Sequence, residues 1–110
     1  MSQKRLFSYG TLRDAAVQRA VFGRTVEGTP DAITGYRLRD VKISSAQAAA
    51  ISGTDAHTIM EPGDGPPIEG MLFVISAADL ARADAYESAE YTRIEVRLRS
   101  GTDAWVYVRG

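Results

Sequence analysis

Residues 91–99 alternate strictly between two kinds of side chain, and this feature restricts the possible folds more than any other. One parity is mainly apolar and the other charged: Thr92, Ile94, Val96 and Leu98 against Arg93, Glu95, Arg97 and Arg99. Successive side chains of a β-strand point to opposite faces of its sheet, so the pattern predicts a strand with one buried and one solvated face. Turn residues at 100–103 and a second apolar run at 104–109 predict a hairpin.

Further strand and helix signals occupy the rest of the chain. Strands are predicted at residues 6–9, 32–41, 58–60 and 68–75, with a break near Gly35 and a loop or short strand at 25–30 that ends at Pro30. The run at 68–75 is apolar on both parities from Met71 onward, which predicts a central strand. Gly70, inside that run, predicts a bulge or a close approach of another segment.

Two helices are predicted from capping signals and apolar spacing. The first covers residues 14–22, with Asp14 or Thr11 as its N-cap and Gly23 as its stop. The second covers residues 77–86, and Ser76 with an acid three residues later forms a capping box at its start. Because strands and helices do not alternate throughout, we expect an α+β fold. Its mixed, curled β-sheet or small β-barrel would have five to seven strands and two main helices.

Composition narrows the functional class. With 110 residues, 45% of them hydrophobic, the chain can bury a core as a single domain over residues 1–110. The absence of cysteine excludes disulfides, thiolate metal sites and a cysteine nucleophile. A net charge of −1 gives no electrostatic reason to expect nucleic acid. No signal-peptide core or membrane span can be drawn, so we expect a cytoplasmic protein with no membrane partner.

A glycine turn between the first strand and the first helix is the first candidate site. It consists of Tyr9, Gly10, Thr11 and Leu12. A turn that opens a helix leaves backbone N–H groups without partners, and such groups can bind a carboxylate or an oxyanion. The same residues are also compatible with a plain strand–turn–helix connection.

A second segment, together with this turn, resembles a known family. The relevant stretches are Tyr9-Gly10-Thr11-Leu12, the strand Gly70-Met71-Leu72-Phe73-Val74-Ile75, Asp84-x-Tyr86-Glu87 and Tyr91-x-Arg93. In this order and at this separation they resemble the gamma-glutamylcyclotransferase-like superfamily. The resemblance is strongest to its short bacterial members, often called AIG2-like, and covers about the whole chain. Many relatives have Gly or Pro after the glutamate, where this chain has Ser-Ala-Glu at 88–90.

The resemblance implies an enzyme that closes a ring without a cofactor or a metal. The α-amine of a small γ-glutamyl amine or peptide would attack its own side-chain carbonyl and release 5-oxoproline. By residue match, Glu87 is the implied general acid/base, and the turn from Tyr9 to Leu12 lines the substrate cavity. We therefore expect Glu87 to lie in one pocket with Gly10 and Thr11. The resemblance does not say whether the protein is a monomer or a homodimer.

Other interpretations remain open from the sequence. The same fold could serve a non-catalytic module that binds a small ligand, or a cyclotransferase that acts on another modified amino acid. Glu87 could be a solvated surface acid, with Glu90 as the nearest rival for its role, and Asp84 a solvated residue or a cap. Tyr91 and Tyr107 could line the cavity or pack in the core and sheet. His57, the only histidine, has no partner that suggests a metal site.

Overall fold

The computed structural model describes residues 3–42, 56–87 and 91–109. Its strands are β1 (Gln3–Ser8), β2 (Gly28–Ile33), β3 (Tyr36–Lys42), β4 (Ala56–Pro62), β5 (Ile68–Ser76), β6 (Tyr91–Arg97) and β7 (Asp103–Arg109). Its helices are the 3₁₀ helix η1 (Thr11–Arg13) and the α-helices α1 (Ala15–Phe22) and α3 (Ala77–Glu87). The α+β prediction is therefore confirmed.

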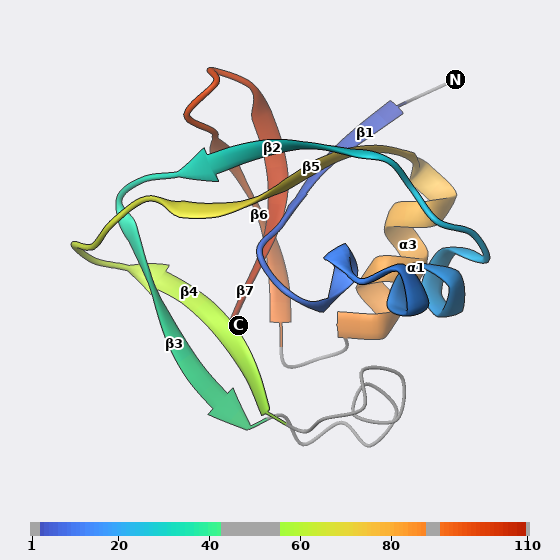
Figure 1. The fold of residues 1–110 in the computed structure, drawn as a ribbon, viewed down its shortest axis with the longest axis horizontal. Helices are drawn as coiled ribbons and strands as arrows, with labels where there is room; N and C mark the ends of the chain where they lie inside the picture. Colours follow the sequence, from blue (N-terminus) through green and yellow to red (C-terminus); the bar gives the residue numbers. More distant parts are fainter. Residues whose placement is uncertain (1–2, 43–55, 88–90, 110) are drawn as a thin grey trace.

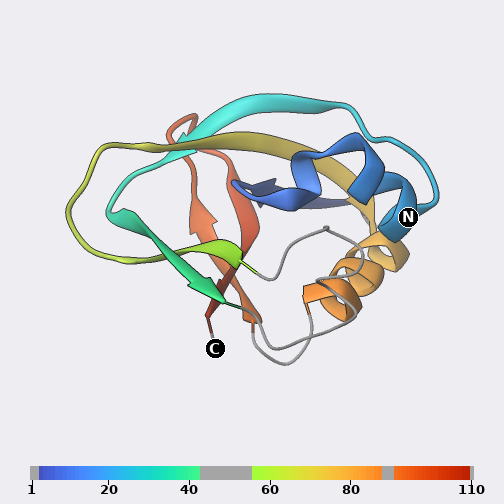
Figure 2. The ribbon, with the colours of Figure 1, turned by 60° about the horizontal axis from the view of Figure 1, so that its bottom comes forward.

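Five strands form one mixed sheet in the order β2-β5-β1-β7-β6, and β3 and β4 form a separate antiparallel pair. β1 is parallel to β7, and the other neighbours are antiparallel. Figure 1 shows α1 and α3 together on one side of the molecule and the β3–β4 pair on the other. The same separation is visible after a rotation of 60° (Figure 2). β5 lies between β2 and β1, as its two apolar faces predict.

The centre of the large sheet is buried on both faces. Consecutive β1 residues show this, because Leu6 belongs to one apolar cluster and Phe7 to the other. The Leu6 cluster includes Val17 and Val21 from α1 and Leu80 and Ala83 from α3, so the helices cover this face. The Phe7 cluster includes Met60 from β4, so the small sheet covers the opposite face. β1 thus runs through the centre of the molecule, and the turn after it begins inside the core.

The β6 register agrees with the prediction from Ile94 onward, whereas Thr92, on the parity expected to be buried, is exposed. Leu98 is buried, and Ile94 and Val96 are partly buried against the Phe7 cluster, whereas Arg97 and Arg99 are exposed. The strand ends at Arg97, two residues earlier than expected, because the Leu98 N–H donates to the Thr102 carbonyl and begins the turn.

The segment around Pro30 differs from the prediction. β2 continues through Pro30 to Ile33, and proline is tolerated there because β2 is an edge strand. The break expected near Gly35 is found: Gly35, with φ +84°, lies where the chain leaves the large sheet and enters the small one, so residues 32–41 are divided between two strands in two sheets. The short strand expected at 58–60 is the longer β4.

The helix signals are confirmed at atomic level. The Asp14 carboxylate accepts hydrogen bonds from the N–H groups of Ala16 and Val17, and Gly23 ends α1 in the left-handed conformation. At α3 the Asp79 N–H donates to the Ser76 hydroxyl at 3.0 Å, and the Ser76 N–H donates to the Asp79 carboxylate at 3.2 Å. Both helices therefore begin where local hydrogen bonding places them.

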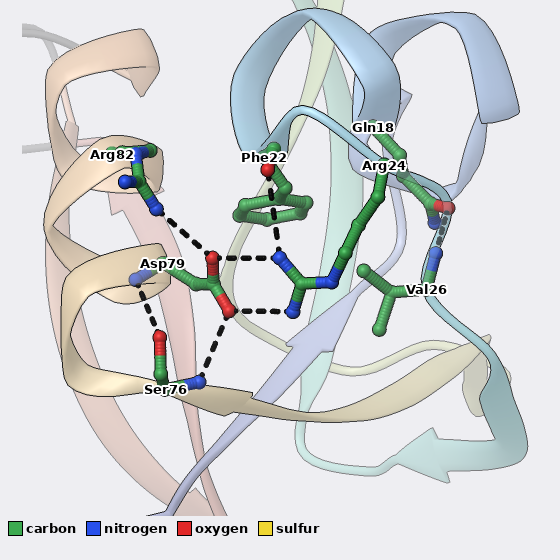
Figure 3. A network of polar contacts seen from close by, with 7 residues as sticks. All are labelled: Gln18, Phe22, Arg24, Val26, Ser76, Asp79 and Arg82. Atoms are coloured by element: carbon green, nitrogen blue, oxygen red, sulfur yellow. Dashed lines mark hydrogen bonds and ion pairs between the residues drawn. The ribbon is translucent and has the colours of Figure 1, made fainter.

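Asp79 also connects α3 to the segment after α1 (Figure 3). Its side chain is 2% exposed and accepts hydrogen bonds from Arg24 at 2.8 and 3.1 Å and from Arg82 at 3.2 Å. The Arg24 hydrogen bonds outweigh the effect of burial and hold the pKa of Asp79 far below its usual value. In the same view, the buried Gln18 accepts from the Val26 N–H. Gln18 also donates to the Leu12 carbonyl, which fixes the end of the glycine turn.

Candidate functional site

A pocket lies where β1 ends, and residues from opposite ends of the chain line it. Its lining consists of Phe7, Ser8, Tyr9, Gly10, Thr11, Leu12, Glu87, Tyr91 and Tyr107. Glu87 is the last residue of α3, and Gly10 and Thr11 begin η1. The expected juxtaposition of Glu87 with the glycine turn is therefore found. The pocket is narrow, with a free volume of about 30 Å³, and a larger hollow adjoins it behind Tyr91 and Tyr107.

The glycine turn, Tyr9 to Leu12, lines part of this pocket. The N–H groups of Thr11 and Leu12 open η1, and no described residue provides an acceptor for them. The Leu12 side chain is 2% exposed and packs in the helix-facing core, so its position anchors the turn. A Cβ built on Gly10 would meet no atom within 4 Å, and Gly10 has φ −126°, so the turn itself does not require glycine.

The tyrosine of the turn has a structural connection that the sequence did not reveal. The Tyr9 hydroxyl donates to the Tyr107 carbonyl at 2.9 Å and accepts from the Met60 N–H at 2.9 Å. This hydroxyl therefore links β7 of the large sheet to β4 of the small sheet. Burial raises the pKa of Tyr9 far above its usual value, so the hydroxyl stays protonated and remains a donor.

Glu87 is a partly buried carboxyl group with an unusual proton affinity. No hydrogen bond or ion pair joins its side chain to another residue in the described part of the chain. Burial raises the pKa of Glu87 to about 7. Its neighbour Tyr86 is buried, and the hydroxyls of Tyr86 and Thr11 share a hydrogen bond of 2.5 Å. The last turn of α3 is thus attached to the glycine turn, and Glu87 is a carboxyl that can both accept and release a proton near neutral pH.

Asp84 is partly solvated, as one expectation had it, with 40% of its side chain exposed, but its carboxylate is paired. Its carboxylate accepts hydrogen bonds from Arg93 Nε at 2.6 Å, from Arg93 Nη2 at 3.0 Å and from the Tyr107 hydroxyl at 2.7 Å. Burial raises the pKa of Asp84, but these hydrogen bonds outweigh burial and hold it below the usual value. Arg93 was expected on a solvated face; instead it is 26% exposed, and its guanidinium lies 4.7 Å from the centre of the Trp105 ring.

The other candidate residues have mixed outcomes. Tyr91 and Tyr107 both line the pocket and also pack against the helix-facing core, so the two interpretations of these tyrosines are compatible. Gly70 does mark a close approach, because an added Cβ would clash with the Ser8 carbonyl oxygen and lie 2.8 Å from Phe7 Cζ. Glu90 and the side chain of His57 lie outside the described residues.

Two kinds of feature are absent from the described residues. No group of three or more His, Cys, Asp and Glu side chains lies close enough together to hold a metal ion in that part of the chain. None of the helices described is long and apolar enough to cross a membrane.

The sequence and the fold are similar to known proteins. The family model described as gamma-glutamyl cyclotransferase, AIG2-like, matches residues 6–110. No curated protein matches the sequence.

Three solved structures illustrate the likeness of the fold. An Arabidopsis thaliana protein studied in solution is 20% identical with a TM-score of 0.75, and the match covers 99% of this chain and 63% of that one. A gamma-glutamyl cyclotransferase is 14% identical with a TM-score of 0.71, covering 99% and 68%. An uncharacterized protein from Pyrococcus horikoshii is 19% identical with a TM-score of 0.65, covering 97% and 78%. At these identities the likeness establishes the fold.

Proposed function

Because this chain belongs to the gamma-glutamyl cyclotransferase, AIG2-like family, we propose that it releases 5-oxoproline from a small γ-glutamyl amine or peptide. The observation that carries the proposal is the position of Glu87. A carboxyl with a pKa of about 7 lies in one pocket with a turn in which the N–H groups of Thr11 and Leu12 have no acceptor among the described residues. This combination provides a base and an oxyanion-binding group, which are the two elements that acyl transfer to an internal amine requires.

In the proposed reaction Glu87 moves one proton. Its carboxylate takes a proton from the substrate's α-amine, and the amine nitrogen forms a bond to the γ-carbonyl carbon. The tetrahedral intermediate then collapses, the bond from that carbon to the leaving nitrogen breaks, and Glu87 returns the proton to this nitrogen. Attack within one molecule avoids the entropic cost of joining two reactants, which is worth up to roughly 7–11 kcal/mol in well-oriented cases.

The turn amides complete the proposed site. The N–H groups of Thr11 and Leu12 would donate to the oxyanion of the tetrahedral intermediate or to the α-carboxylate of the substrate. Since the free volume beside Glu87 is only about 30 Å³, binding would require side chains at the mouth of the pocket to move.

The proposal is tested by measuring 5-oxoproline release from a panel of γ-glutamyl amines and γ-glutamyl peptides, with binding measured by calorimetry on the same compounds. Release from at least one compound supports the proposal. Binding of a γ-glutamyl compound without release by the parent protein contradicts it and identifies a binding module. The panel also shows which leaving groups the protein accepts, because the compounds differ from one another only in the amine that is released.

The pH dependence of the reaction follows from the pKa of Glu87. The base must be ionised, and burial raises the pKa of Glu87 to about 7. We therefore expect log(kcat/KM) to rise with slope of about one below pH 7 and to level off above it, until another group titrates. Initial rates of 5-oxoproline release between pH 5 and pH 9 measure this profile. An inflection near pH 4.5, the ordinary value for glutamate, would contradict the assignment.

A further prediction concerns Gly10. A Cβ at this position contacts no protein atom within 4 Å and creates no φ strain, so Gly10→Ala should change the free energy of unfolding by less than about 1 kcal/mol. If the substrate packs against the turn, the added methyl group should raise KM or lower kcat/KM by roughly tenfold or more. Denaturation and steady-state kinetics on the same variant separate the two effects. Unchanged kcat/KM would show that substrate does not approach Gly10.

A further inference from the structure

Within the described part of the chain, no hydrogen bond or ion pair holds the Glu87 side chain in the pocket. Glu87 is the last residue of α3, and no described residue forms a hydrogen bond or an ion pair with its carboxylate. A carboxylate at a helix end is better hydrated outside the protein, so the backbone of the last helical turn must be fixed for the side chain to stay partly buried. Two attachments of this turn are found, one through Tyr86 and one through Asp84.

The first attachment joins the turn to the glycine segment. Tyr86 is 4% exposed, and its hydroxyl shares a hydrogen bond with Thr11 Oγ1. This attachment fixes α3 relative to η1 but not relative to the strands that form the rest of the pocket wall.

The second attachment starts at Asp84, which precedes Glu87 by three residues and therefore lies on a neighbouring part of the helix surface. Its carboxylate receives two hydrogen bonds from the Arg93 fork on β6 and one from the Tyr107 hydroxyl on β7. Arg93 is itself held against the Trp105 ring. Tyr107 lines the pocket, and its carbonyl accepts from the Tyr9 hydroxyl, so this network joins α3 to both strands behind Glu87.

We propose that Asp84, Arg93 and Tyr107 are positioning residues for Glu87: they hold the last turn of α3 against β6 and β7 and so keep the Glu87 carboxylate in the pocket. The inference rests on the proposed function only in naming Glu87 as the base. None of the three residues needs to touch the reacting atoms for this role.

The geometry distinguishes this network from an ordinary surface ion pair. The Arg97–Asp103 pair joins the same two strands, but it has one hydrogen bond of 3.1 Å between side chains that are 74% and 52% exposed. Such pairs contribute little. The Asp84 carboxylate instead accepts three hydrogen bonds, two of them from a planar guanidinium in bidentate geometry, which fixes orientation as well as distance. Asp103→Ala is therefore a matched control.

The decisive variant is Arg93→Gln, with the pKa of the Glu87 carboxyl measured by NMR titration, which needs no substrate. This variant removes the positive charge of Arg93 and leaves the Asp84 carboxylate without a cationic partner. If charge were the only effect, both changes would raise the pKa of Glu87. Release of the helix turn would let Glu87 reach water and lower its pKa from about 7 toward 4.5. Positioning and electrostatics therefore predict shifts of opposite sign, and we expect a decrease of at least one unit.

Two further variants and a control complete the test. Arg93→Lys keeps the charge but not the fork, so the pKa of Glu87 should fall by less than in Arg93→Gln. Tyr107→Phe removes one hydrogen bond without changing any charge at neutral pH and should also lower it. Asp103→Ala should leave it unchanged. A pKa of Glu87 that stays constant or rises in both Arg93→Gln and Tyr107→Phe overturns the inference.

The kinetic readout is separate from this titration. Misplacement of a base by about 1 Å can cost roughly 10²-fold, so Arg93→Gln should lower kcat about 10- to 100-fold with a smaller change in KM. If the parent protein releases no 5-oxoproline, the proposed function fails, whereas the NMR titration still decides whether the network places Glu87.

Discussion

Replacing Glu87 with glutamine is expected to lower turnover by roughly 10²–10⁴-fold while ligand affinity stays close to that of the parent protein. Glutamine keeps the shape of the side chain, but it cannot accept the proton of the substrate's α-amine. The turn amides and the pocket walls are unchanged, so the contacts that would bind substrate remain. The measurement is a pair of experiments on both proteins with one ligand: calorimetric binding and release of 5-oxoproline.

Stability provides the control for this variant. Burial raises the pKa of Glu87 from 4.5 to about 7, so between these values the folded protein binds more protons than the unfolded chain. The stabilisation associated with the protonated form is therefore present below about pH 4.5 and is lost as pH rises through about 7. Above pH 7 the ionised carboxylate costs on the order of 3 kcal/mol. Glutamine avoids this cost, so Glu87→Gln should unfold at a higher denaturant concentration than the parent at pH 8.

An inactive but more stable Glu87→Gln variant would exclude misfolding as the cause of inactivity. Full activity in this variant would eliminate Glu87 as the base, and Glu90 would be the next residue to replace. A parent protein that binds γ-glutamyl compounds, forms no 5-oxoproline and changes only in affinity after substitution would be a binding module on the same fold.

Much of the fold could be predicted because its signals are local. Asp14 and Gly23 delimit α1, and Ser76 with Asp79 begins α3, since each signal acts within four residues of the helix end. The alternation of apolar and charged side chains along β6 likewise indicates directly that one face of the strand is buried. The pairing partners of the strands could not be predicted in this way, because hydrogen bonds between strands join segments that are distant in the sequence. Nothing near Gly35 indicates that the strands before and after it belong to different sheets.

The candidate site likewise combines features that could be predicted from the sequence with features that could not. Family resemblance indicated both Glu87 and the glycine turn, and the fold brings them together because β1 runs centrally beside α3. The supporting contacts could not be predicted. The Tyr9 hydroxyl reaches a carbonyl 98 residues away and an N–H 51 residues away, and these distances along the chain leave no local pattern. For Asp84 and Arg93, nine residues apart, each charge is equally compatible with solvent exposure until the helix and β6 are placed.

Asp79→Ala is expected to be the most destabilising of the substitutions considered, with a loss of about 2–3 kcal/mol in the free energy of unfolding. The change removes the capping box of α3, a contribution of about 1 kcal/mol, and charge-assisted hydrogen bonds worth roughly 1.5–3 kcal/mol. The loss should stay below that of a fully buried broken pair, because Arg24 and Arg82 are 54% and 56% exposed and regain hydration. Chemical denaturation measures the change.

Asp79→Asn separates the two contributions, because an amide oxygen can still accept from the Ser76 N–H but no longer pairs with Arg24. We expect the free energy of unfolding of Asp79→Asn to lie between those of the parent and Asp79→Ala. Asp103→Ala, which breaks an exposed ion pair, should stay within about 1 kcal/mol of the parent.

The dependence of stability on acid pH provides a second test. The Arg24 hydrogen bonds hold the pKa of Asp79 far below its unfolded value of 3.8. Its stabilisation is therefore complete above about pH 5 and is lost as pH falls below 3.8. The parent should thus lose its advantage over Asp79→Asn progressively below pH 4, and an advantage that stays constant down to pH 2 would contradict an ionised Asp79 in the folded protein.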